Sequence, residues 1–307
     1  MFGSREEFTY FQCSSCGCLQ IETIPEDLHR HYPSDYYSQQ TTPMTEVRRS
    51  IRSIVIRHYS RTIALNPKSL YAELLRKALP TPIDFLEIGE YLIKARLMTS
   101  DERILDVGCG ASPKRLAAMR RCGFLNVLGI DPFINADSTY CGVDVKKCRL
   151  EDLTGQFGLI MYHHSLEHVP DPLASLSAAA SLLRPNGLCL VRIPVMDTFF
   201  WREFGCNWAE LDAPRHLYLM ATKTIELLCA KTGFLLEGAT FDSSGWEIAA
   251  SELYQRDESM FERTSTGLHN NLTQFSKNEN DRFDSIAATL NKSSDGGRAC
   301  FYLRRNA

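Results

Sequence analysis

The feature that most constrains this chain is a short apolar segment running into a glycine turn, Arg103-Ile-Leu-Asp-Val-Gly-Cys-Gly-Ala-Ser-Pro113. Ile104–Val107 predicts a buried strand, and Pro113 suits the first turn of a helix, where its missing amide hydrogen is not needed. Gly108 and Gly110 carry no Cβ, so the backbone can turn tightly and a ligand can approach it closely. Asp106 adds a carboxylate beside this turn, facing the crevice where ligands of open α/β sheets bind.

The chemistry of this turn indicates which kind of ligand it favours. A dinucleotide-binding fingerprint requires a third glycine where this sequence has Pro113, and Asp106 does not suit a pyrophosphate. The acid suits a ligand that offers positive charge or hydrogen-bond donors. A second apolar segment, Asn126-Val-Leu-Gly-Ile-Asp131, ends in an acid about twenty residues later, where a carboxylate accepts the ribose hydroxyls of an adenosine-type cofactor.

Four segments in order resemble the motifs of the class I S-adenosylmethionine-dependent (SAM-dependent) methyltransferases. The third is Phe157–Pro172, which contains Glu167-His-Val-Pro-Asp-Pro172, and the fourth is Leu183–Pro194. The resemblance covers roughly residues 84–242 and departs from the family at Gly158, where an Asp is usual. It implies a Rossmann-like α/β fold, with a seven-stranded and mostly parallel sheet in the order 3-2-1-4-5-7-6, the seventh strand antiparallel, and helices on both faces.

The chain divides into three expected parts: a Cys-x-x-Cys segment at 1–40, a helical cap at 41–100, and the methyltransferase domain at 101–307. We expect the helices of the second part to cap the cofactor end of the sheet. The first of them has an apolar stripe at helical spacing, formed by Ile51, Val55, Tyr59 and Ile63. Five arginines lie largely off this stripe: Arg48, Arg49, Arg52, Arg57 and Arg61. They form either a basic lip for a phosphorylated substrate or a solvated helix face, and runs of charge are more often a solvated face.

An aromatic-rich insertion at 194–221 follows the fifth expected strand. It holds Phe199, Phe200, Trp201, Phe204, Trp208 and Tyr218. Such an insertion is interpreted as a lid over the substrate. The alternative is a satellite hydrophobic cluster under a long loop, and the two are compatible.

The resemblance also implies the residues that bind SAM. Those of the glycine turn are Asp106, Gly108, Cys109 and Gly110, and those after the second strand are Asp131 and Pro132. Leu150 and Glu151 would flank and read the adenine, and His163 ends the fourth strand. The alternative for the segment at 148–153 is a surface loop.

Methyl transfer to a hydroxyl or an acidic carbon needs a general base, for which histidine is the commonest choice near neutral pH. His164, His168 and His216 are the candidates, each with a structural role as its alternative. His164-x-x-Glu167-His168 is similar to the Glu-x-x-Glu-His of quinone-type O-methyltransferases that use a divalent metal. Because the first acid is replaced by His164, we predict no metal here. Arg192 and Arg215 are either a clamp for an acidic substrate group or surface ion pairs.

The N-terminal Cys13-Ser-Ser-Cys16-Gly has the shape of one zinc knuckle, but a structural zinc needs four ligands. Cys18, His29 and His31 are the candidates to complete a site. Zinc at Cys13 and Cys16 is therefore not predicted, and a knuckle remnant without metal is the preferred interpretation.

Charge and composition exclude several classes of partner. With 34 basic and 37 acidic residues, no overall field attracts nucleic acid or an anionic membrane. The sequence starts without a signal-peptide profile, and 11 scattered cysteines are typical of a reduced, cytoplasmic protein.

We therefore expect a biosynthetic enzyme that moves a methyl group from SAM to an O, N or C atom of a small molecule, a sugar or a secondary-metabolite intermediate. The alternatives are a non-catalytic SAM- or partner-binding module and, more remotely, a nicotinamide-dependent oxidoreductase. The acceptor and the oligomeric state are left open by the sequence.

Overall fold

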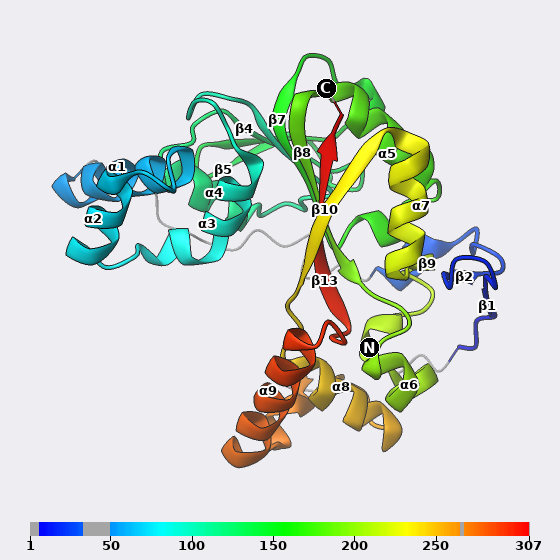
Figure 1. Cartoon of the computed structure of the whole chain (residues 1–307). Coiled ribbons are helices and arrows are strands. Elements are labelled where there is room, and N and C mark those ends of the chain that lie inside the picture. The colour runs from blue at the N-terminus through cyan, green and yellow to red at the C-terminus, as the bar shows by residue number, and fades with distance from the viewer. Residues whose placement is uncertain (1–5, 33–49, 265–266, 307) are drawn as a thin grey trace.

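The computed structural model describes residues 6–32, 50–264 and 267–306. An eight-stranded sheet lies at its centre, in the order β10-β13-β8-β7-β3-β4-β6-β5 (Figure 1). Five adjacent strands run parallel to one another: β3 (Ile104–Val107), β4 (Val127–Ile130), β6 (Val143–Lys146), β7 (Phe157–His163) and β8 (Leu183–Pro194). β13 (Arg298–Arg305) is antiparallel to both β8 and β10 (Phe234–Phe241).

This order is the one that the sequence predicts, with one additional strand. β5 (Ser138–Tyr140) is this additional strand, and it pairs antiparallel with β6 at the edge of the sheet. Tyr140 pairs with Val143, so only Cys141 and Gly142 form the turn, and both have positive φ angles, of 51° and 77°. Two-residue turns of this kind match the twist of a hairpin, although Cys-Gly is a weaker sequence signal than Asn-Gly.

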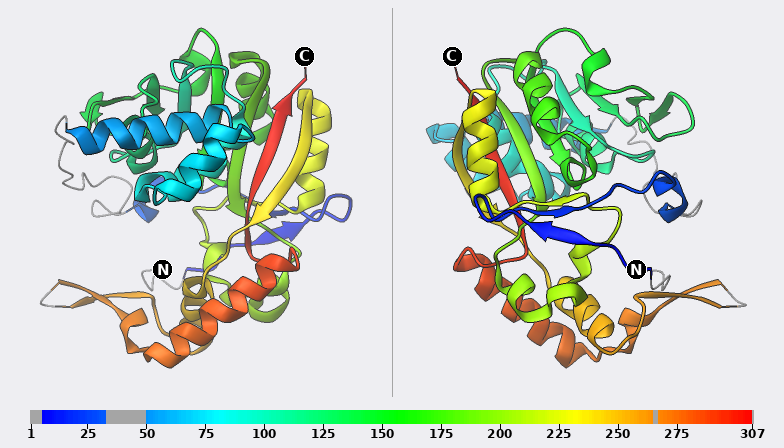
Figure 2. Two further views of the ribbon diagram at one scale, coloured as in Figure 1. Left: turned by 60° about the vertical axis from the view of Figure 1, so that its left-hand side comes forward. Right: turned by 90° about the vertical axis from the view of Figure 1, so that its right-hand side faces the viewer.

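Helices cover both faces of the sheet (Figures 1 and 2). One face packs against α1 (Ile51–Leu65), α3 (Ile83–Ala95) and α4 (Lys114–Arg121), with α2 (Leu70–Ala78) beside α1. The other face packs against α5 (Pro172–Leu182) and α7 (Thr222–Thr232). Strand side chains alternate between the two layers, so Leu159 joins the first core and Ile160 the second.

Helices α1 and α3, in the segment predicted to be a cap at 41–100, share the main core of the sheet. Their role as a cap over the cofactor end stays a prediction. Ile88 and Leu92 of α3 are fully buried in the cluster that contains Leu159 of β7. Only part of the predicted stripe on α1 is used, because Tyr59 is 2% exposed whereas Ile51 is 83% exposed. Of the five arginines, Arg52 and Arg61 are exposed and Arg57 is half-buried, while Arg48 and Arg49 lie outside the described residues.

The insertion at 194–221 forms a third hydrophobic cluster with the C-terminal helices. It contains α6 (Phe199–Phe204), the short helices η4 (Gly205–Asn207) and η5 (Ala209–Leu211), and β9 (Tyr218–Leu219). Phe200 and Trp208 are buried against α8 (Gly245–Gln255) and α9 (Lys277–Lys292). The aromatic residues thus build a packed support, as the satellite-cluster alternative predicts. The lid function remains a prediction.

Two hairpins lie outside the main sheet. β1 (Tyr10–Gln12) and β2 (Leu19–Ile21) form the first, and β2 also pairs with β9, which ties the N-terminal segment to the insertion. β11 (Phe261–Thr264) and β12 (Gly267–Asn270) form the second, between α8 and α9, followed by η6 (Asn271–Gln274). Among the described helices, none has the length and apolar character needed to cross a membrane.

The Cys-x-x-Cys turn keeps the knuckle shape. Gly17 has a φ of 79°, and its amide donates to the Cys13 carbonyl at 2.8 Å. Cys18 is buried in the second core, where its thiol donates to the Leu19 carbonyl. Within the described part of the chain, no third metal ligand approaches Cys13 and Cys16.

Candidate functional site

The glycine turn after β3 is fixed by the end of β4. The amides of Gly108 and Cys109 both donate to the Ile130 carbonyl, at 2.8 and 3.2 Å. The Gly110 amide donates to Asp131 Oδ2 at 3.0 Å. Gly108 and Gly110 have φ angles of 72° and 65°, which glycine adopts without strain. The turn and the second acid are therefore held together as one unit.

The loop after β7 packs directly on this turn. Ser165 Oγ donates to the Val107 carbonyl at 2.6 Å, and a Cβ on Gly108 would lie 2.5 Å from Ser165 Cβ. Cys109 turns its thiol toward β4, where a Cβ on Gly129 would lie 2.5 Å from Cys109 Sγ. Gly108 and Gly129 are thus required by close packing. Cys109 contacts β4 twice, through its amide at Ile130 and through its thiol at Gly129.

Asp106 has the chemical properties expected for binding a cation. Its side chain is 3% exposed, and its Oδ1 atom has no hydrogen-bond partner among the residues described. Burial raises the pKa of this carboxyl to about 7, although nearby Arg115 opposes the rise. An ammonium group beside Asp106 would both pair with Oδ1 and favour the ionised carboxylate. The residue therefore fits the amino-acid end of SAM, which carries an ammonium group.

Asp131 fits the ribose of the same molecule. It is half-buried, and its Oδ1 atom accepts from the Phe133 amide at 2.8 Å. Together with the bond from Gly110, each carboxylate oxygen accepts one hydrogen bond and retains a second lone pair for a hydroxyl. Burial raises the pKa of Asp131. Pro132 is half-buried beside it, Leu150 is buried in η2 (Leu150–Asp152), and Glu151 is exposed.

His163 and His164 end β7 in different environments. His163 is buried against the ring of Tyr91 from α3, with 5.3 Å between ring centroids, and neither of its nitrogens has a partner among the described residues. His164 Nε2 accepts from Arg192 Nη1 at 2.6 Å. Burial first, and then Arg192, hold the pKa of His164 well below its usual value. His164 is thus neutral, with its proton on Nδ1, and has no free lone pair, so this geometry argues against its predicted role as a base.

His168 and His216 lie side by side, although they are far apart in the sequence. Their ring centroids are 4.8 Å apart. His168 lies in η3 (Leu166–His168), and its Nδ1 is 2.8 Å from the Arg215 carbonyl. His216 Nδ1 is 2.6 Å from the Glu210 carbonyl. Because a carbonyl only accepts, Nδ1 of each ring carries the proton and Nε2 has a free lone pair.

The two histidines share one buried acid, Glu167. Its side chain is 1% exposed, and neither oxygen has a hydrogen-bond partner within the described ranges. Burial raises the pKa of Glu167 well above its ordinary value and lowers the pKa of His168 to about 3. Burial also lowers the pKa of His216. Near neutral pH both imidazoles are therefore neutral, and each keeps an Nε2 lone pair that can bind a ligand.

Arg192 and Arg215, for which a substrate clamp and surface ion pairs were the two alternatives, are both paired with protein carboxylates. Arg192 Nε contacts Asp242 Oδ2 at 2.5 Å, and Arg215 forms an ion pair with Asp212. Sequence reasoning missed Asp242, whose only signal is its position directly after β10. It also missed Arg298, which lies among three carboxylates, those of Asp242, Glu210 and Glu247.

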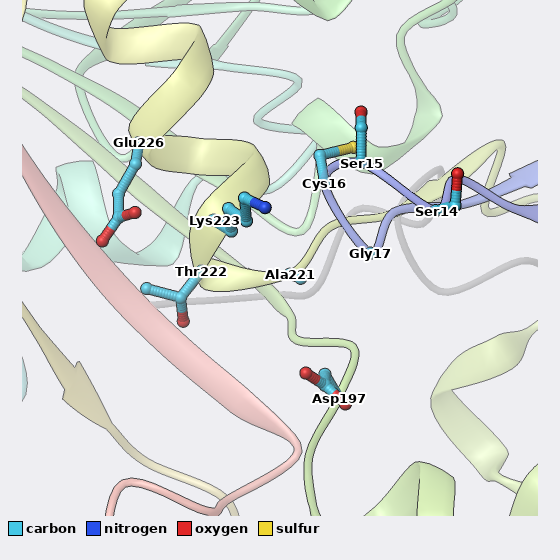
Figure 3. Close-up of a pocket in the computed structure, with 9 residues that line it drawn as sticks. All are labelled: Ser14, Ser15, Cys16, Gly17, Asp197, Ala221, Thr222, Lys223 and Glu226. Carbon is cyan, nitrogen blue, oxygen red and sulfur yellow. The ribbon is translucent and has the colours of Figure 1, made fainter.

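Two surface hollows lie elsewhere. One, of about 560 Å³, lies between the Cys-x-x-Cys turn and the start of α7, and its lining includes Cys16, Asp197 and Lys223 (Figure 3). The other, of about 530 Å³, follows α1 and is lined by Arg57, His58 and Arg61 among others. Neither lining includes Asp106 or Asp131, as far as the described residues go.

Comparisons with known proteins identify the family of this chain. A family model described as a methyltransferase domain matches residues 59–239. The ubiquinone biosynthesis O-methyltransferase of Xanthomonas campestris pv. campestris (strain B100) is 33% identical over 105 residues, which are 31% of this chain and 44% of the relative. That of Xylella fastidiosa (strain M23) is 33% identical over 109 residues, 32% and 44% of the two chains. This chain therefore spans less than half the length of these curated relatives.

Solved structures resemble the chain more distantly. A phosphoethanolamine N-methyltransferase 2 of Haemonchus contortus in complex with SAM has 18% identity and a TM-score of 0.44, covering 81% of this chain and 60% of that one. The cyclopropane synthase MmaA2 of Mycobacterium tuberculosis has 18% identity and a TM-score of 0.42, covering 85% and 100%. The assignment does not depend on these two structures. The family model spans more than half of the chain, and the chain belongs to the class I SAM-dependent methyltransferases.

Proposed function

We propose that this protein transfers a methyl group from SAM to an O, N or C atom of a small molecule in the biosynthesis of a sugar or a secondary metabolite. The observation that carries the proposal is the pair of acids at the glycine turn. Asp106 has a buried, unpartnered oxygen, counted over the described residues, and Asp131 is held beside it through Gly110. An ammonium group and a ribose diol satisfy these two acids, whereas a pyrophosphate does not.

When bound, SAM supplies a methyl group already activated on a sulfonium. In the transfer, an electron pair of the acceptor forms a bond to the methyl carbon, the carbon–sulfur bond breaks, and its pair stays on the sulfur of S-adenosylhomocysteine. An acceptor hydroxyl also loses its proton. The protein therefore has to align the acceptor and, for a hydroxyl, to help remove that proton.

His168, His216 and Glu167 are in a suitable place for this second task. Their loop packs on the glycine turn through Ser165. His216 comes from the insertion at 194–221, so this insertion helps to build the acceptor side. The cluster activates the acceptor, while the acids of the turn hold the cofactor.

Two measurements test this function. Calorimetry should give one SAM per chain and no comparable binding of NAD, the ligand of the oxidoreductase alternative. Nucleotide sugars and phenols should then be incubated with SAM and the protein and screened for a mass gain of one methyl group. Binding of SAM without any methylated product would favour a non-catalytic SAM-binding module. Binding of NAD in place of SAM would contradict the proposal.

A further inference from the structure

The cluster of Glu167, His168 and His216 has the arrangement of a metal site. Its three potential ligand atoms, one from each residue, lie within 4.8 Å of one another. Glu167 and His168 come from the loop after β7, and His216 comes from the insertion, so the fold brings together residues about fifty positions apart. No other group of this kind occurs among the described residues.

The hydrogen bonds of the histidines are those expected of metal ligands. A ligating histidine usually donates its second ring N–H to a carbonyl or a carboxylate, which fixes the ring and its tautomer. His168 does so to the Arg215 carbonyl at 2.8 Å, and His216 to the Glu210 carbonyl at 2.6 Å. Both Nε2 lone pairs therefore remain available, and His216 Nε2 lies 4.0 Å from Glu167 Oε1.

Glu167 supplies an independent observation. Its side chain is almost fully buried, and neither oxygen has a hydrogen-bond partner in the described part of the chain. His164 Nδ1, at 3.5 Å from Oε1, is beyond an ordinary N–H···O hydrogen bond. Buried carboxylates are normally paired or bound to a metal, and no protein group pairs with the Glu167 carboxyl by a hydrogen bond among the residues described. A cation between the three side chains would satisfy Glu167 and both Nε2 atoms together.

We infer that Glu167, His168 and His216 bind one divalent transition-metal ion, with Zn²⁺ as the best match to two imidazoles and a carboxylate. Zinc bonds of about 2.1 Å place tetrahedral ligand atoms roughly 3.4 Å apart, so ligand atoms that lie within 4.8 Å of one another need to close by up to about 1.4 Å. Three protein ligands leave one position open. On the proposed function, an acceptor oxygen at that position would lose its proton more readily, which makes a hydroxyl the acceptor class.

This inference replaces our prediction of no metal, and the structure explains the difference. The prediction rested on His164 in place of an acid. His164 has no lone pair available for a metal in this cluster, because its Nε2 accepts a hydrogen bond from Arg192. The third ligand comes instead from His216, whose approach to Glu167 depends on the fold of the insertion and is not visible in the local motif.

Titration of the metal-free protein with Zn²⁺ and Co²⁺, followed by calorimetry and visible absorption, tests the site. We expect one ion per chain and a Co²⁺ spectrum without a thiolate charge-transfer band. Glu167→Gln and His216→Gln should each weaken binding at least tenfold. His58→Gln, at an exposed histidine on α1, and the double variant Cys13→Ser/Cys16→Ser should leave binding unchanged.

SAM affinity, measured in the same variants, separates this inference from the proposed function. If Glu167→Gln and His216→Gln bind SAM like the parent protein, they are folded, and their loss of metal binding supports the site. A variant that fails to bind SAM is replaced by His168→Gln. If the parent protein takes up no ion, or if uptake disappears in the double cysteine variant and survives in Glu167→Gln, the inference is wrong whatever the outcome for SAM.

Discussion

Replacing Asp106 with Asn should stabilise the ligand-free protein at neutral and alkaline pH while abolishing its response to SAM. The carboxyl is buried, and burial raises its pKa from 3.8 to about 7. Between these two pH values the folded carboxyl keeps its proton, whereas the unfolded carboxyl has released it. The unfolded chain therefore binds fewer protons than the folded protein. The free energy of unfolding therefore falls as the pH rises from about 3.8 to about 7.

The size of the effect follows from the shift in pKa. A rise of about 3 pKa units at 1.36 kcal/mol per unit costs the folded protein about 4 kcal/mol above pH 7. An Asn cannot ionise, so it avoids this cost, but its amide is also incompletely hydrogen-bonded, so about 4 kcal/mol is an upper bound. For a domain of this size, the melting temperature of Asp106→Asn at pH 8 should exceed that of the parent by roughly 5–10 °C at most.

Differential scanning fluorimetry between pH 5 and pH 9, with and without SAM, measures both parts of the prediction. The parent protein should lose stability between pH 5 and pH 7 and regain it with SAM, whereas Asp106→Asn should show neither change. Asp101→Asn, at an exposed acid just before β3, serves as the control and should behave like the parent. A variant that is less stable than the parent at pH 8, or that responds to SAM as strongly, would refute the reasoning.

Three further changes test other parts of the account. Gly108→Ala should lose both stability and SAM affinity, because its Cβ would meet Ser165. Gly233→Ala has a similar φ of 75° and open space around it, so it should lower the free energy of unfolding, measured by chemical denaturation, by only about 1–2 kcal/mol. Asp131→Ala should weaken SAM binding at least tenfold in calorimetry, through loss of the ribose contact; unchanged affinity would remove Asp131 from the cofactor site. Trp208→Ala should lower the free energy of unfolding by about 3–5 kcal/mol, because the side chain is fully buried; a smaller loss would contradict the packed support formed by the insertion.

The sequence predicted the sheet well because its strands are short apolar runs bounded by clear signals. The sixth strand and the helix before it begin and end where expected, since Gly233 takes the left-handed conformation that ends a helix. β5 was missed because Cys141-Gly142 is not a common hairpin turn. The packing partners of α1 and α3 were left open because amphipathic spacing indicates that a helix has a buried face and does not indicate which surface it packs against.

The candidate site was predicted only in part, for a related reason. Asp106 and Asp131 lie in local motifs, so their positions follow from the order of the strands. The pairing of His168 with His216, and of His164 with Arg192, depends on how the insertion folds over the sheet. Sequence spacing contains no information on such distant contacts, so the three histidines were predicted as one set, although His164 has a different environment from the other two.

The most direct test of the central claim is an experimental structure of the protein bound to S-adenosylhomocysteine, the stable product of SAM. The account predicts that the amino group of the ligand lies within hydrogen-bond distance of Asp106 Oδ1 and that its ribose hydroxyls contact Asp131. Density for the ligand in the hollow beside the Cys-x-x-Cys turn, with side chains closing the space between the two acids, would contradict it.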